Sequence, residues 1–201
     1  MGLVDIQYEE DQTPLDEEEK EGLLLSSVTT RSELNEVEQK NIEEAMRWTI
    51  ERRKKFTADE ILTEKFVREL HRKMLGSVWE WAGRFRQSNK NIGVDRYQIG
   101  VELWTLLNDC KFWIDNKSFS EDEIAIRFKH RLVSIHCFAN GNGRHSRLVA
   151  DVIADKIFGR EVFTWGESNL IHRGEFRSLY ITALQAADKG NYQPLLTFAR
   201  A

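Results

Sequence analysis

The sequence predicts an all-α domain that carries one small β-hairpin, and three observations support this prediction. Apolar residues recur at helical spacing through most of the chain from Leu23 onward. Thr57 and Ser120 each stand three positions before a glutamate where such a stripe begins, which is the pattern of a capping box. Within residues 83–100, turn residues separate two short β-compatible pieces. We therefore expect helices throughout, with a hairpin over residues 83–100.

The expected helices follow one another with short connections. Their apolar stripes, in chain order, are Leu34, Val37, Ala45 and Trp48; Phe66, Leu70 and Met74, after the capping box at Thr57; Trp104, Leu107 and Ile114; Ile124, Phe128, Leu132 and Ile135, after the one at Ser120; Leu148, Val149, Val152, Ile153 and Ile157; and Phe176, Leu179, Tyr180, Ala183, Leu184 and Ala187. Gly159 and Gly190 end the last two stripes, and Pro194 opens a short final helix.

Charge divides the chain into two parts. Residues 1–22 hold nine acidic residues against Lys20 alone, so we expect an acidic, flexible N-terminal arm followed by one domain over residues 23–201. The whole chain has a net charge of −4, so the expected domain carries +4. This mild positive charge is compatible with a phosphate-bearing ligand but is too weak to indicate nucleic acid as the primary ligand.

The sequence also narrows the location of the protein. It has no long apolar run, and its acidic start lacks the features of a signal peptide. Its two cysteines, Cys110 and Cys137, make no disulfide framework and no zinc motif, so we expect reduced thiols. We therefore expect a cytoplasmic protein with no membrane partner. A homodimer is compatible with the sequence, which does not determine the oligomeric state.

Residues 136–147 read HCFANGNGRHSR and lie between two expected helices. A glycine-containing turn that leads into a helix N-terminus offers unpaired N–H groups and the positive end of the helix dipole, which together suit an anion. Arg144 and Arg147 stand three positions apart in the first turn of that helix and present forked donors that match phosphate oxygens. The pattern favours a polyphosphate over a single phosphate.

His136 precedes this turn and is the candidate general base, because a neutral imidazole can accept a proton from a hydroxyl near the phosphate. The alternative is a buried histidine that packs in the core beside Ile135. Phe138 is expected to anchor the turn in the core. Asn142 can bond either the ligand or its own loop.

The pattern H-x-F-x-x-G-N-G-R-x-x-R resembles the signature of the Fic (Fido) family, H-P-F-x-[D/E]-G-N-G-R-x-x-R. The stretches TPLD and TTRSELN near the N-terminus are similar to a Fic subgroup called mobile mystery protein B. The resemblance implies a mostly helical fold and transfer of AMP from ATP to a Ser, Thr or Tyr hydroxyl of a target protein. It implies His136 as the base, Gly141, Asn142 and Gly143 around the phosphates, Arg144 at the β-phosphate and Arg147 at the γ-phosphate.

Two residues depart from the family signature. Cys137 replaces the usual proline, which we expect to change the stiffness of the loop. Asn140 replaces the acid that normally helps to hold Mg²⁺, and an amide oxygen brings no negative charge to a hard cation. The metal, Mg²⁺ or Mn²⁺, should therefore bind more weakly. Three interpretations stay open: a weaker or differently selective transferase, a nucleotide binder without catalysis, and an enzyme matured by deamidation at Asn140.

Two further features follow from the resemblance. Fic proteins present a flap that pairs main-chain groups with an extended target segment, and Ile92, Gly93 and Val94 are its expected contacts here. Many also carry an inhibitory helix, [S/T]-x-x-x-E-[G/N], to which the stretch from Thr29 corresponds in part, with Glu33 as the inhibitory glutamate. The alternative for Glu33 is a capping box with Thr30.

The sequence thus predicts an adenylyltransferase that uses ATP and an unidentified target protein, with autoinhibition as a further hypothesis. Two alternatives remain. Loss of the acid at position 140 favours a regulatory protein that binds nucleotide without catalysis. ATP bound in the opposite direction would present its γ-phosphate and make the protein a phosphotransferase.

Overall fold

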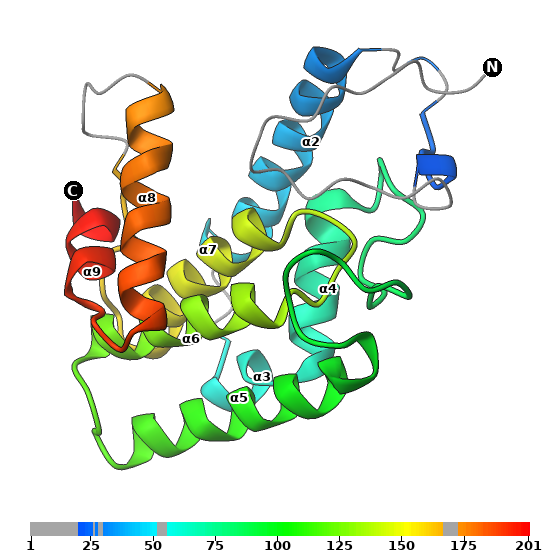
Figure 1. Ribbon diagram of the computed structural model, residues 1–201. Helices are drawn as coiled ribbons and strands as arrows, with labels where there is room; N and C mark the ends of the chain where they lie inside the picture. Colours follow the sequence, from blue (N-terminus) through cyan, green and yellow to red (C-terminus); the bar gives the residue numbers. More distant parts are fainter. Residues whose placement is uncertain (1–19, 26, 28–29, 52–55, 167–172) are drawn as a thin grey trace.

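The computed structural model describes residues 20–25, 27, 30–51, 56–166 and 173–201, and this part of the chain is predominantly helical (Figure 1). The all-α prediction is confirmed. The helices are α2 (Arg31–Met46), α3 (Ala58–Ile61), α4 (Glu64–Leu75), α5 (Ile99–Asp115), α6 (Glu121–Ile135), α7 (Asn142–Val152), α8 (Arg173–Asp188) and α9 (Gln193–Arg200). Short π-helical turns extend α2 over Arg47–Glu51 and α7 over Ile153–Ile157.

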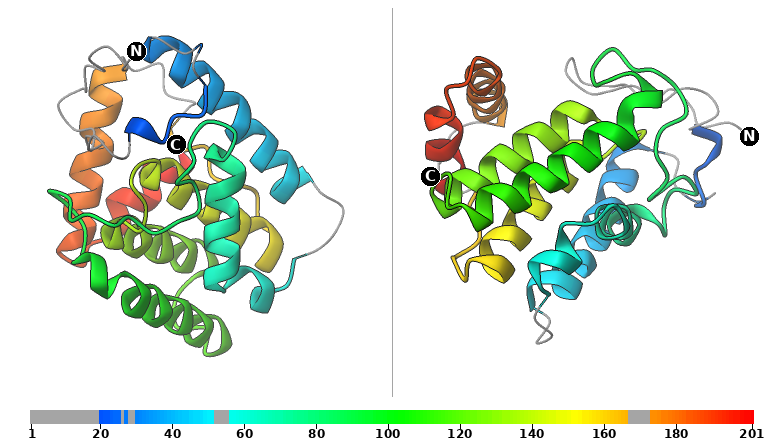
Figure 2. Two further views of the ribbon diagram at one scale, coloured as in Figure 1. Left: turned by 90° about the vertical axis from the view of Figure 1, so that its right-hand side faces the viewer. Right: turned by 90° about the horizontal axis from the view of Figure 1, so that it is seen from below.

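Helices α6 and α7 form the centre of the molecule, and α7 runs back along α6 after the intervening loop (Figure 1). Helix α5 lies along the other side of α6 (Figure 2). Helices α2 and α4 pack together near the loop between α6 and α7, whereas α8 and α9 pack together toward the opposite end of α6. The α6–α7 loop therefore lies at one end of the central helix pair.

The predicted apolar face of α6 is confirmed, since all four of its residues are buried: Ile124, Phe128, Leu132 and Ile135. The face of α7 is confirmed by its buried residues Leu148, Val149, Val152 and Ile153. These two faces meet at the centre of the core. The loop that joins the helices is therefore attached to the most deeply buried part of the protein.

Side-chain caps set the start of several helices. Thr30 and Thr57 each form both hydrogen bonds of a capping box, with Glu33 and Glu60 respectively. Ser120 accepts a hydrogen bond from the backbone N–H of Glu123 at 3.3 Å. Each cap satisfies an N–H group that the helix itself leaves unpaired, so the predicted cap positions are confirmed.

Two helix predictions need correction. The helix expected from the capping box at Thr57 through Met74 is two helices, because Thr63 accepts a hydrogen bond from the N–H of Phe66 and starts α4 anew. Trp104 is 67% exposed, although it was expected in the core. The buried face of α5 is instead formed by Ile99, Leu103, Leu106, Leu107 and Cys110, which fits the helical period better than a stripe through Trp104.

The expected β-hairpin is also wrong. Residues 83–95 form a loop, and a short 3-10 turn over Arg96–Gln98 leads into α5. Side chains rather than strand pairing hold this loop: Asn89 donates to the Asp95 carboxylate at 2.9 Å and accepts from the N–H of Arg96 at 2.8 Å. The isolated antiparallel bridge in the described residues lies elsewhere, between Leu23 and Trp79.

Some predictions fall on parts of the chain that the structure does not describe. The acidic arm lies outside the described residues as far as position 19, and so does the side chain of Phe176. In the rest of α8, Ala183 and Ala187 are buried as expected, whereas Leu179 is half exposed. Among the described helices, none is both long enough and apolar enough to cross a bilayer.

Candidate active site

The motif predicted from the sequence occupies the loop between α6 and α7. Helix α6 ends at Ile135, and His136 follows in the left-handed conformation with φ of 57°. Gly141, with φ of 77°, then starts α7. The candidate base therefore lies at the end of one helix, and the predicted anion site lies at the start of the next.

Phe138 anchors this loop in the core. Its side chain is fully buried, and its ring stacks on the His71 imidazole with a centroid separation of 3.7 Å. The Nδ1 atom of His71 accepts a hydrogen bond from the N–H of Gly83, so the proton of its neutral ring is on Nε2, which donates to the carbonyl oxygen of Asn140. His71 thus ties the loop to the residues that follow α4.

Asn142 closes the loop from the other side. Its Oδ1 accepts from the N–H of Phe138 at 3.0 Å, and its Nδ2 donates to the carbonyl of Phe138 at 2.8 Å. Of the two predicted partners for Asn142, the structure therefore shows its own loop. Asn142 can contribute its backbone N–H to an anion at the start of α7, while its side chain fixes the shape of the turn.

The start of α7 is closed on one side and open on the other. A Cβ atom at Gly141 would lie 2.6 Å from Leu75 Cδ1, and the positive φ at this position also favours glycine. A Cβ atom at Gly143 would meet nothing within 4 Å. The open side leaves space for a ligand beside the first-turn N–H groups, which have no partner inside the helix.

His136 is buried but chemically suited to accept a proton. Burial, and after it the positive charge of Arg86, lowers its pKa from 6.5 to about 4. The imidazole is therefore neutral at pH 7. A neutral imidazole is the form that a general base requires.

Arg144 does not point to open solvent. Its guanidinium lies 2.7 Å from the carboxylate of Glu38 on α2, and Glu38 is buried. The other carboxylate oxygen of Glu38 accepts from Trp79 Nε1 at 2.7 Å. One of the two predicted phosphate ligands is thus paired with an acid from the N-terminal helix.

Arg147 lies in a different environment. Its guanidinium carbon is 5.9 Å from the centre of the Tyr180 ring on α8. Lys129 of α6 is fully buried nearby and donates to the Tyr180 hydroxyl. Burial and the charge of Arg147 hold the pKa of Lys129 well below its usual range. The charge of the Arg147 guanidinium would attract an anion bound beside it.

The loop offers a poor set of ligands for Mg²⁺. The side-chain oxygen of Asn140 accepts from the N–H of Gly141 at 2.6 Å, so it serves the turn. Among the described residues, no group of three or more His, Cys, Asp or Glu side chains is arranged to hold a metal ion. A hard cation prefers carboxylate oxygens, and the residues present do not supply them.

The flap predicted at Ile92, Gly93 and Val94 lies beside the motif, although it is not a hairpin. The N–H of Val94 donates to the carbonyl of Ile135 at 3.3 Å. A Cβ atom at Gly93 would lie 2.6 Å from His136 Cβ, so the two backbones are in close contact. Ile92 is 50% exposed. The structure therefore brings Gly93 and Val94 next to the candidate base.

Glu33 forms the capping box with Thr30, which confirms the alternative interpretation of this residue. The contact between α2 and the motif is made by Glu38 instead. Glu38 shares a helical face with the buried residues Leu34 and Ala45. An acid on an apolar face requires a buried partner, and this signal in the sequence could have identified Glu38.

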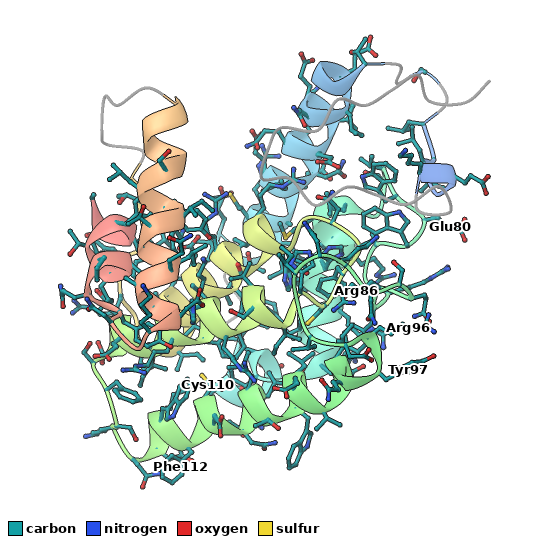
Figure 3. All side chains as sticks on the ribbon, in the orientation of Figure 1. Glu80, Arg86, Arg96, Tyr97, Cys110 and Phe112 are labelled. Carbon is teal, nitrogen blue, oxygen red and sulfur yellow. The ribbon has the colours of Figure 1, made fainter. Side chains whose placement is uncertain are left out.

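Sequence reasoning also missed Arg86, His71 and His145. Arg86 lies in the loop before α5, where no periodic pattern marks a buried residue (Figure 3). His145 is buried on α7, and its Nε2 lies 2.9 Å from the carbonyl of Val67 on α4. His71 and His145 stand on helices at positions that read as ordinary core, so only the folded contacts show their role.

A separate open groove of about 820 Å³ runs along α4 and the residues after it. Several of its charged residues form ion pairs with one another, such as Arg68 with Glu64 and Arg84 with Glu80. An anion would have to compete with these carboxylates. The groove therefore makes a weaker anion site than the start of α7.

A helical domain whose predicted anion site lies in a loop between two central helices is the class of protein that this fold and site define. The Fic/DOC family model matches residues 61–154, which include the whole motif. The protein adenylyltransferase Fic of Aedes aegypti is 29% identical over 144 residues, and that of Culex quinquefasciatus is 28% identical over 144 residues. The family match and these relatives support a Fic family protein.

The matched region is a large part of this chain but a small part of each mosquito protein. The alignments span 70% of this chain and 27% of each mosquito protein, so the chain corresponds to about a quarter of these relatives. Solved structures share the fold: BepC from Bartonella tribocorum with bound AMPPNP has a TM-score of 0.65 at 18% identity, covering 92% of this chain and 97% of BepC. Fic-1 from C. elegans has a TM-score of 0.61 at 21% identity, covering 90% and 51%.

The two hydrogen bonds between the Asn142 side chain and the main chain of Phe138, here called the Asn142 clamp, should contribute to the free energy of unfolding. Replacing Asn142 with Ala leaves the buried N–H and carbonyl of Phe138 without their partner, so the free energy of unfolding should fall by about 2–4 kcal/mol. Urea unfolding measures this. Asn108→Ala is the matched control, because its amide bonds an exposed helix carbonyl, and it should change stability by less than about 0.5 kcal/mol. Equal effects of the two substitutions would contradict the clamp.

The buried histidines should make the protein less stable in acid. His136 and His145 have a pKa of about 4 when folded against 6.5 when unfolded, and the pKa of His71 is also lowered. The stability from these neutral rings is fully present above pH 6.5 and is lost as the pH falls toward 4. Each ring contributes a slope of at most about 1.4 kcal/mol per pH unit.

Asp151 acts in the opposite direction, because burial raises its pKa to about 7, and its contribution is lost as the pH rises through that value. The three histidines should outweigh it. Urea unfolding at pH 5.0, 6.0 and 7.5 should therefore show stability rising with pH. His145→Gln, which keeps a donor toward Val67, should flatten the slope. A flat or falling profile in the parent protein would show that the histidines do not control acid stability.

Proposed function

We propose that this chain transfers AMP from ATP to a Ser, Thr or Tyr hydroxyl of a target protein. The observation that carries this proposal is the placement of a buried, neutral His136 at one end of a loop whose other end is the start of α7. The names of the mosquito relatives, protein adenylyltransferase Fic, support the same activity. The AMPPNP bound to BepC and the ADP bound to a Bartonella quintana Fic domain support a nucleotide at this site.

In the proposed reaction, His136 accepts the proton of the target hydroxyl as its oxygen attacks the α-phosphorus of ATP. The new bond joins this oxygen to the α-phosphorus, and the bond between the α-phosphorus and the bridging oxygen breaks. Pyrophosphate leaves with its electrons. The first-turn N–H groups of α7 and the side chains of Arg144 and Arg147 bind the phosphates and stabilise the charge that develops on the leaving group.

Target binding would use the flap. Gly93 and Val94 lie beside the end of α6 and His136, so an extended target segment along this loop would present a hydroxyl near the base. Main-chain pairing places little demand on the target's side chains. The modified residue would then be decided by position along the flap more than by its identity.

The metal is a separate matter. Because Asn140 brings no charge and its oxygen serves the turn, we assign no metal ligand to the loop. Charge neutralisation in the proposed site rests on Arg144, Arg147 and the helix N-terminus. The deamidation hypothesis for Asn140 stays a prediction, as does the subgroup resemblance.

We also propose that autoinhibition in this chain works through Glu38. Its carboxylate lies where a phosphate would meet Arg144, at 2.7 Å from the guanidinium. A nucleotide that uses Arg144 must displace this ion pair or share the arginine with it. Glu33, the glutamate expected from the sequence, is engaged at the helix start with Thr30.

The second candidate function is nucleotide binding without catalysis, and the engagement of Asn140 with Gly141 favours it. Such a protein would respond to ATP by releasing Glu38 and moving α2. A third candidate, phosphoryl transfer, would use the same loop with ATP in the opposite direction. The three candidates differ in the label that the protein acquires from ATP, which comes from the α-phosphate, from the γ-phosphate or from neither.

Incubation with ATP should label the protein, or an added target, from the α-phosphate and not from the γ-phosphate. His136→Ala should reduce this labelling by roughly 10²–10⁴-fold, because the base is lost. His130→Gln, on α6 one to two turns before His136 and bonded to Asp188, should retain it. Label from the γ-phosphate would establish phosphoryl transfer, and ATP binding without any label would support the non-catalytic protein.

Glu38→Gln should raise ATP affinity or transfer by several-fold, since it removes the charge that holds Arg144 and keeps an acceptor for Trp79. Isothermal titration with ATP measures the affinity. Glu33→Gln is the matched control on the same helix and should leave both quantities within about twofold. If Glu33→Gln raises them and Glu38→Gln does not, Glu33 is the inhibitory residue. If neither variant changes them, α2 is not inhibitory.

A further inference from the structure

Arg86 is a buried arginine that joins the flap to the end of α6. Only 3% of the residue is exposed. Its Nε donates to the carbonyl of His136 at 2.7 Å, its Nη1 donates to the carbonyl of Ser88 at 2.8 Å, and its Nη2 donates to the carbonyl of Val94. Figure 3 labels Arg86, which lies in the loop before α5. One guanidinium thus binds carbonyls from both segments.

The first consequence concerns the backbone at His136. This residue adopts the left-handed conformation, which is unfavourable for a non-glycine residue and persists only where neighbouring groups hold it. Arg86 holds it through the His136 carbonyl, and the backbone N–H of Arg86 donates to the carbonyl of Cys137 at 3.0 Å. Residue 86 therefore fixes two successive peptide groups at the candidate base.

The second consequence concerns the flap. Arg86 binds the carbonyl of Val94, while the N–H of Val94 donates to Ile135. Gly93 lies so close that an added Cβ would be 2.6 Å from His136 Cβ and 3.0 Å from Arg86 Nη2. The flap position and the imidazole position are thus set by the same side chain, and neither can shift far without the other.

The third consequence is electrostatic. The charged groups that act on His136 are Arg86 and Lys90, and both lie in the loop before α5. Burial is the largest cause of the lowered pKa, Arg86 is the next, and Lys90 has a smaller effect. A permanently charged guanidinium beside the ring keeps the imidazole neutral over a wider pH range.

We propose that Arg86 is a positioning residue that sets the orientation of His136 relative to the flap, so that a target segment on the flap presents its hydroxyl to the base. Arg86 acts through main-chain carbonyls and contacts neither ATP nor target. The catalytic part of this inference rests on the proposed function. The structural part, which is the coupling between Arg86, His136 and Val94, stands without it.

Lysine and glutamine at position 86 separate geometry from charge. Arg86→Lys keeps the charge but loses the fork that reaches three carbonyls, so kcat should fall by about tenfold to a hundredfold, with KM for ATP within about twofold and the acidic limb of the pH profile unchanged. Arg86→Gln should lower kcat similarly and also move the acidic limb to higher pH. Lys90→Gln should move the limb slightly upward without the loss in kcat.

A second measurement does not need activity. NMR titration of the histidine ring should show the pKa of His136 rising from about 4 toward 6.5 in Arg86→Gln. The amide of Val94 should exchange faster with solvent in both Arg86 variants. If Arg86→Gln does not fold, Gly93→Ala replaces it, since the added Cβ disturbs the same contact and keeps the charge; it should lower kcat and speed Val94 exchange.

The outcomes separate the two proposals. No transfer in the parent protein, with altered His136 pKa and Val94 exchange in the variants, would overturn the proposed function and leave the coupling intact. Normal transfer in the parent, with folded Arg86 variants that match it in kcat, His136 pKa and Val94 exchange, would overturn the role of Arg86. A change limited to the KM for ATP would also overturn the positioning role of Arg86, because that result would mean that Arg86 acts on nucleotide binding.

Discussion

The site depends on the pair of hydrogen bonds between the Asn142 side chain and the main chain of Phe138. The two residues are four positions apart, and the amide group bridges them from inside the fold. With the Phe138 ring buried, this clamp turns a short connection between helices into a rigid support. The positions of His136 before it and of the α7 N-terminus after it both follow from this support. An Asn is required there because it both accepts and donates, which an Asp cannot do in its ionised form.

The two arginines of the motif lie in different surroundings. Arg144 faces the N-terminal helix and is paired with Glu38, whereas Arg147 faces α8 beside Tyr180 and Lys129. A single polyphosphate along the start of α7 would meet both arginines. It would have to compete with the Glu38 carboxylate at Arg144, whereas Arg147 lies beside the Tyr180 ring. The two ends of the anion site therefore differ in the free energy needed to occupy them.

Much of the fold could be predicted from sequence, because local rules decide it. Thr57 and Ser120 start helices through their own side chains, and the α6 face from Ile124 to Ile135 is buried as its period requires. Trp104 shows the limit of periodicity, since a neighbouring stripe of α5 fits the core better. The hairpin failed for a related reason. Residues that favour turns and strands do not reveal that a buried arginine will hold the segment by its carbonyls.

The candidate site divides in the same way. His136, Gly141 and Arg144 lie within one short stretch, so their proximity follows from sequence spacing alone. Glu38 and Arg86 reach the site from about 100 and 50 residues away in the chain, and only the packing of α2 and of the flap brings them there. Glu38 gave a partial signal as an acid on an apolar helical face. Arg86 gave no such signal, because a loop residue belongs to no periodic apolar face on which a charged side chain would stand out.

Asn140 keeps the shape of the turn but removes a negative charge from the loop. Its side-chain oxygen accepts the N–H of Gly141 and so helps to form the turn, in the position where the Fic signature has an acid. An aspartate could accept the same N–H more strongly and still carry charge toward a metal. With asparagine the turn is kept and the charge is lost, and a polyphosphate must then be neutralised by Arg144, Arg147 and the helix N-terminus. The ion pair between Glu38 and Arg144 consequently has more influence here than it would beside a bound cation, because it removes one of the few positive charges that remain.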